Sequence, residues 1–149
     1  MRLLRRQKGA VFIDVMMGIY LLVILVFAFA ATMSAAVISR AIADQRTKAA
    51  ALVSRQLESV KAAGYGGLTY DGLRYFGLVE NEPARPPYRF SNVGASSERV
   101  SNILPSGSGT VDVSDVSGSM RMVTVAVSWT GPNGRTRTVI ASTKIARLK

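Results

Sequence analysis

The feature that most constrains this chain is a long apolar run near its N-terminus. No charged residue occurs from Val15 to Ser39, and this run exceeds the ~20 residues that a helix needs to cross the hydrocarbon core of a bilayer. Leu, Ile, Val, Phe, Met and Ala fill most of the run. The run therefore predicts a membrane-spanning helix and argues against the core helix of a soluble protein.

One acid, Asp14, lies at the start of this run, with apolar residues on both sides. A carboxylate in lipid costs about 2.5–3.5 kcal/mol, and acids in such positions usually have a function. A plain membrane anchor would gain nothing from this charge. We therefore expect a positively charged group to meet Asp14.

The residues before Asp14 form a recognisable motif. Four basic residues open the chain: Arg2, Arg5, Arg6 and Lys8. Gly9 and Ala10 follow them, and Asp14 is the fifth residue counted from Ala10. In these residues the chain resembles the type IV pilin family, which includes minor pilins and the pseudopilins of type II secretion. That family has a short basic leader ending in Gly, a cut after this Gly and an acid at the fifth mature position, most often Glu after a first Phe or Met.

The resemblance implies a processing and assembly route. A prepilin peptidase would cut after Gly9 and N-methylate Ala10, and an inner-membrane assembly platform would add the subunit to a filament of other pilin or pseudopilin subunits. The family also implies that Asp14 pairs with the amino terminus of a neighbouring subunit. The chain would first span the inner membrane once, with its N-terminus cytoplasmic, and would then enter a periplasmic or extracellular pilus or pseudopilus. The sequence leaves open which of these filament systems is served.

The same features predict the division of the chain. Residues 1–9 are the leader, 10–39 the transmembrane or filament-core helix and 40–149 a globular head. The basic leader stays cytoplasmic by the positive-inside rule. An alternative remains open, in which the run is a signal peptide cut before Ala31 or a simple single-span anchor, and the remainder is a β-rich binding domain.

The helix is predicted to continue into the head, over residues 40–63, as an amphipathic segment. Apolar residues recur at helical spacing and define one face: Ile38, Ile42, Ala49, Val53, Leu57 and Val60. Asp44 and Lys48 have the spacing of an ion pair on the surface of a helix. No proline interrupts residues 10–63, and Gly64 to Gly67 end the helix. We therefore expect one continuous helix over 10–63.

The rest of the head is predicted as a loop followed by antiparallel strands. Residues 64–87 are rich in Gly, Tyr and Pro and read as irregular. Strands are expected over 88–93, 110–116, 120–129 and 135–145, with a loop over 94–109 and a turn over 131–134. Val123, Val125, Val127 and Trp129 would form the apolar face that the helix covers. The fold class is therefore α+β, a long N-terminal helix packed on a four-stranded meander within residues 88–149.

Composition limits the chemistry of the head. The chain has no Cys and no His, which removes thiolate metal sites, disulfides and the commonest general base. No nucleophile elbow, phosphate-binding glycine loop or calcium loop occurs, and Asp71, Glu80 and Glu82 read as loop charges. We therefore expect no enzyme activity, cofactor or metal. The net charge of +10 falls to +6 (10 − 4) when residues 1–9 are removed, so nucleic acid remains an open alternative partner.

Overall fold

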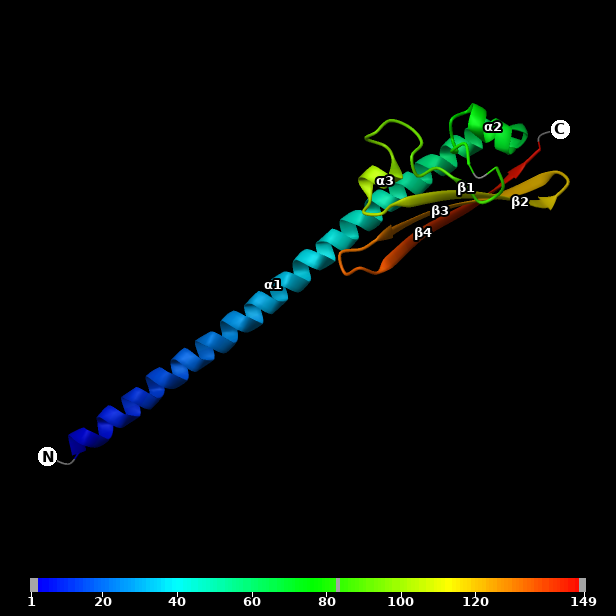
Figure 1. Cartoon of the computed structure of the whole chain (residues 1–149). Helices are drawn as coiled ribbons and strands as arrows, with labels where there is room; N and C mark the ends of the chain where they lie inside the picture. The colour runs from blue at the N-terminus through cyan, green and yellow to red at the C-terminus, as the bar shows by residue number, and fades with distance from the viewer. Residues whose placement is uncertain (1–2, 83, 148–149) are drawn as a thin grey trace. The chain divides into compact units, whose positions relative to one another are not determined.

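The computed structural model describes residues 3–82 and 84–147, and for residues 3–11 it describes the helix but not the side chains. The fold is α+β, as predicted, with a long N-terminal helix and one four-stranded antiparallel sheet (Figure 1). The chain forms two compact units, Met1–Arg40 and Ala41–Lys149. We call the second unit the head.

Helix α1 runs from Leu3 to Ala63, so the expected helix over 10–63 is confirmed and begins earlier. It ends where the glycines begin. Gly64 has a φ of 68°, a conformation that favours glycine, and its backbone N–H donates to the Lys61 carbonyl over 3.0 Å. The glycine-rich segment therefore stops the helix as the sequence predicted.

The sheet has the predicted meander topology, with neighbours in the order β1-β2-β3-β4. Its three long strands are β2 (Ser108–Ser117), β3 (Met120–Thr130) and β4 (Thr136–Ala146), and each matches a predicted strand to within two residues at either end. Val125 of β3 lies opposite both Val111 of β2 and Ala141 of β4. The predicted turn joins β3 to β4, where the Gly131 N–H donates to the Arg135 carbonyl over 2.9 Å.

The first predicted strand, over 88–93, is wrong in extent. Strand β1 covers only Tyr88–Arg89. The Phe90 N–H still bonds to the Gly109 carbonyl over 3.0 Å, but the chain then turns, and the Val93 N–H bonds back to the Phe90 carbonyl over 3.5 Å. Pairing with β2 therefore stops at once.

Two segments predicted as loops contain short helices. Within 64–87 lie the 3₁₀ helix η1 (Tyr65–Gly67) and α2 (Tyr70–Tyr75), and within 94–109 lies α3 (Val100–Ile103). The Thr69 hydroxyl caps α2 by accepting from the Gly72 N–H over 3.2 Å. Each α-helix places one residue in the core, Leu73 from α2 and Val100 from α3. Burial of these side chains holds helices too short to form alone.

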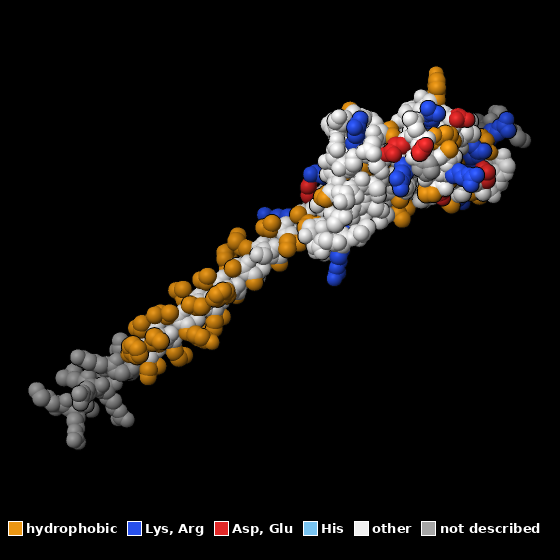
Figure 2. All heavy atoms as spheres, viewed as in Figure 1, with side chains coloured by type: hydrophobic (Ala, Val, Ile, Leu, Met, Phe, Trp, Pro, Cys, Tyr) orange, Lys and Arg blue, Asp and Glu red, His pale blue; other side chains and the backbone are white. Residues whose placement is uncertain are grey.

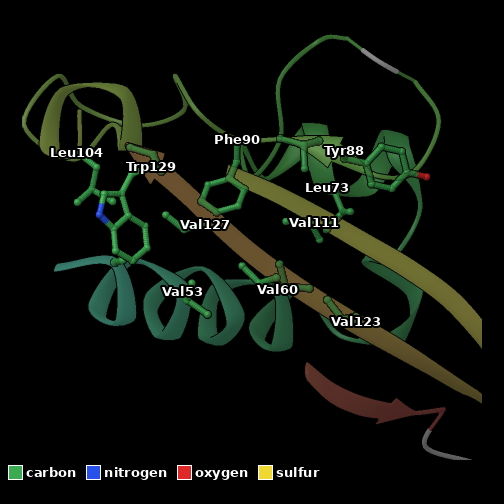
Figure 3. Packing of buried hydrophobic residues seen from close by; sticks show 14 of the residues in the cluster. Val53, Val60, Leu73, Tyr88, Phe90, Leu104, Val111, Val123, Val127 and Trp129 are labelled. Atoms are coloured by element: carbon green, nitrogen blue, oxygen red, sulfur yellow. The ribbon is translucent and has the colours of Figure 1, made fainter. Parts of the chain in front are cut away.

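The core of the head lies between the last part of α1 and one face of the sheet (Figure 3). Its α1 members are Ala49, Val53 and Val60. The alternating residues of β3 are buried as predicted: Val123, Val125, Val127 and Trp129. Ile42 and Leu57 are half-buried, whereas Ile38, which was predicted on the same face, is 46% exposed and belongs to the first unit.

Candidate functional site

From Phe12 to Ser39, helix α1 presents an apolar surface on every side. Hydrophobic side chains cover the face of this part of α1 that is seen in Figure 2. Large apolar side chains from Phe12 to Ile38 are exposed, and Phe27 is the most exposed of them at 72%. This part of α1 is long and apolar enough to cross a membrane. A helix that is apolar all round requires an apolar medium, either lipid or other helices.

Asp14 is the only charged residue on this surface among the residues whose side chains are described. It is exposed and lies between Ile13 and Val15, which are also exposed. No described cation lies within ion-pair distance of it, because the three ion pairs of the structure are elsewhere. Within a single chain, the described residues therefore offer Asp14 no partner.

The other predicted site residues fall where the structure gives no side chains. Gly9 and Ala10 lie within the bounds of α1, but the structure does not describe the surroundings of Gly9 or the side chains of Ala10, Arg5, Arg6 and Lys8. Arg2 lies outside the described chain altogether. Cleavage after Gly9, methylation of Ala10 and the role of the basic leader therefore stay predictions.

The charges of the head form three ion pairs among the described residues. The predicted Asp44–Lys48 pair is present at 2.8 Å, and Glu98 pairs with Arg55 and Asp115 with Arg121 at the same distance. All three are at least partly open to solvent, so each contributes little to stability. No group of His, Cys, Asp and Glu side chains in the described residues could hold a metal ion.

Glu80 and Tyr88 have identifiable structural roles. Glu80, predicted as a loop charge, accepts from the backbone N–H of Asn92 over 2.8 Å and so ties two loops together. Burial raises the pKa of the Tyr88 phenol above its ordinary value of 10.0, although nearby Arg121 opposes this shift and Asp112 adds to it. Tyr88 is 7% exposed and belongs to the core of the head.

Sequence reasoning missed one polar site in the head. Arg46 of α1 and Arg137 of β4 line the same small pocket beside Trp129. Their separation in the sequence gives no sign of this, and neither residue belongs to a motif. The alternation of β4 does place Arg137 on the same face as Val139 and Ala141, an unusual position for an arginine.

Comparison with protein-family models, curated proteins and solved structures found no match to this chain. The architecture itself is that of a pilin-like protein in general terms, a long apolar N-terminal helix whose last part packs on an antiparallel sheet.

Proposed function

We propose that this protein is a structural subunit, a minor pilin or pseudopilin, of a type IV pilus or type II secretion pseudopilus. The observation that carries the proposal is the part of α1 from Phe12 to Ser39, which is apolar on every side and contains one charged residue, Asp14. A folded head joined to such a helix needs an apolar medium for one part and water for the other.

The proposal gives the helix two successive environments. In the membrane, lipid would surround the side chains from Phe12 to Ile38. In the filament, the same helices from many subunits would surround one another. The transfer exchanges one apolar medium for another, so cohesion would come from close packing of helices more than from removal of water.

Asp14 gives the filament its register. An unpaired carboxylate is costly in an apolar core, and so is the free amino group that cleavage would create at Ala10. If Asp14 of one subunit pairs with the amino terminus of its neighbour, both costs fall. Such a pair forms only at one axial offset between the two helices, so it would align subunits that apolar packing alone would let slide.

The proposed partners follow from this route. They are a prepilin peptidase that acts at Gly9 and methylates Ala10, an inner-membrane assembly platform, and other pilin or pseudopilin subunits. We favour a minor component because the head is small and has no Cys for a closing disulfide.

Cleavage tests membership of this class directly. The change Gly9→Val should leave the chain uncut in the membrane, because a peptidase site shaped for glycine has no room for a branched side chain. The intact mass of the protein, purified from membranes that contain a prepilin peptidase, should correspond to residues 10–149 with one N-methyl group for the natural chain and to unmodified residues 1–149 for the variant.

Gly18→Val is the matched control. It makes the same substitution in the same helix, at a glycine where an added Cβ would meet nothing within 4 Å, and it should be cleaved normally. A mature protein that begins at Ala31 would contradict the proposal and favour a secreted β-rich domain.

A further inference from the structure

A small pocket of the head is lined by two arginines and no acid. Its volume is about 230 Å³, and its lining consists of Arg46, Trp129, Arg137, Thr138 and Val139. The three ion pairs among the described residues involve other cations. Two arginines therefore line one pocket whose lining contains no carboxylate; Arg46 is exposed and Arg137 is half-buried.

The pocket is held in place by the core. Trp129 and Arg137 lie directly opposite each other on β3 and β4, so both project from the face of the sheet that packs on α1. The Trp129 indole N–H donates to the Gln45 side-chain oxygen over 3.1 Å, which fixes α1 at the residue next to Arg46. Gly131 adds room, since a Cβ there would lie 3.1 Å from the Arg137 Nε.

One atom in this pocket lacks the partner that it needs. The Arg137 Nε is buried, and no described group accepts a hydrogen bond from it. A buried donor without an acceptor loses its hydration and gains nothing in return, and the loss is larger for a charged group. An anion in the pocket would accept this hydrogen bond and would be attracted by the charges of both arginines.

We propose that the pocket formed by Arg46 and Arg137 binds a phosphate group, either free phosphate or the headgroup of an anionic phospholipid. The planar fork of a guanidinium matches two oxygens of one phosphate. A tetrahedral phosphate has further oxygens for a second guanidinium from another element, whereas a carboxylate has only two. The pocket therefore suits a phosphate between α1 and β4.

The position of Arg46 in the sequence makes a lipid source feasible. Arg46 follows the end of the charge-free run at Ser39 by a few residues, and seven residues of helix span about 10 Å. This step rests on the proposed function, because it assumes that the run lies in a membrane before assembly. Binding of free phosphate does not depend on that assumption.

The test uses the full chain in a phosphate-free maltoside detergent. Trp129 is the only tryptophan of the chain and lines the pocket, so its emission reports occupancy. We expect a saturable change in emission with inorganic phosphate, with short-chain phosphatidylglycerol, or with both, and none with chloride at equal ionic strength. Phosphate alone would identify a soluble ligand, and phosphatidylglycerol alone would identify a lipid site.

Variants separate this site from general attraction to a basic protein. Arg137→Gln and Arg46→Gln should each raise the dissociation constant about tenfold or more, because each removes charged hydrogen bonds. Arg135→Gln removes the same charge from an exposed residue outside the pocket and should change the constant less than twofold. Circular dichroism melting curves confirm that the variants fold.

Three results would overturn the proposal. The first is the absence of any saturable response beyond that to chloride, and the second is an equal loss of affinity in Arg135→Gln. The third is an emission change that depends on protein concentration without phosphate, which would mean that an acidic group of a second copy fills the pocket. The binding measurement needs neither cleavage nor assembly, so its outcome is independent of the outcome of the Gly9→Val test.

Discussion

The two parts of helix α1 have the same backbone and different surfaces. From Phe12 to Ser39 apolar side chains are exposed in every direction, whereas in residues 41–63 only one face is apolar and that face is buried against the sheet. Phe27 is 72% exposed in the first part, and Ala49 and Val60 are fully buried in the second.

The difference shows what each part of the helix requires. The single apolar face of the second part is buried within the same chain, because the sheet covers it. The apolar side chains of the first part are exposed in the described chain, and we propose that lipid or other helices surround them. The second part contributes to the core of the head, and under the proposed function the first part would hold the protein in a membrane or a filament.

Deletion of residues 1–38 should have the largest effect, because it removes most of the first part of α1 and leaves the second part intact. Without them the head should become a soluble, folded monomer, because the core members of α1 begin at Ala49. Fractionation, followed by gel filtration of the soluble protein, measures this. Deletion of residues 1–9 alone is the control and should leave the protein with the membrane. A head that precipitates or unfolds would mean that the two parts are not independent.

Replacement of Trp129 tests the core that the second part of α1 forms with the sheet. Trp129 is 2% exposed and bonds to Gln45, so Trp129→Ala should lower the free energy of unfolding of the head by about 3–5 kcal/mol. Urea unfolding followed by circular dichroism measures the loss. Ile140→Ala is the control, because Ile140 is 62% exposed on the other face of the sheet, and it should cost less than about 0.5 kcal/mol. A loss below about 1 kcal/mol for Trp129→Ala would contradict the core described above.

A smaller effect is expected at Gly109, where the chain leaves room for an aromatic ring. A Cβ at Gly109 would lie 2.5–2.7 Å from carbons of the Phe90 ring. Gly109→Ala should therefore destabilise the head by about 1–3 kcal/mol, since the buried ring must shift. Gly118→Ala, where an added Cβ meets nothing within 4 Å, should be close to neutral in the same urea unfolding assay. Equal stability of the two variants would show that the ring moves freely.

Much of this fold could be predicted because its signals are local. The glycines from Gly64 end α1, and the alternation of Val123 to Trp129 identifies β3 and its buried face. The short helices α2 and α3 could not be predicted, because tertiary burial of Leu73 and Val100 holds them and no pattern of their own does. The prediction for β1 extends too far for a similar reason, because a turn that depends on the rest of the fold ends the strand.

The candidate sites divide in the same way. Asp14 could be identified from the sequence because a charge in an apolar run is conspicuous without any structure. The pocket of Arg46 and Arg137 could not, because it exists only where β4 lies beside α1 and because either arginine alone reads as a solvated charge. The partner of Asp14 stays a prediction, because it would belong to another subunit and no contact within one chain can test it.

We propose that Asp14 aligns neighbouring subunits, and the amount of each Asp14 variant in filaments tests this role. The measurement compares the natural chain with Asp14→Glu and Asp14→Asn for membrane abundance, mature mass and amount in sheared filaments. If the role of Asp14 were in membrane insertion, the Asn variant should insert as well as the natural chain or better, because a neutral side chain enters lipid more easily. If Asp14 pairs with an amino terminus, Glu should be tolerated, since it keeps the charge.

We therefore predict that the Asn variant is inserted and cleaved like the natural chain but is depleted from filaments, whereas the Glu variant is incorporated. Equal incorporation of the Asn variant, at equal membrane abundance and with the same mature mass, would contradict the claim that this acid is the contact between subunits.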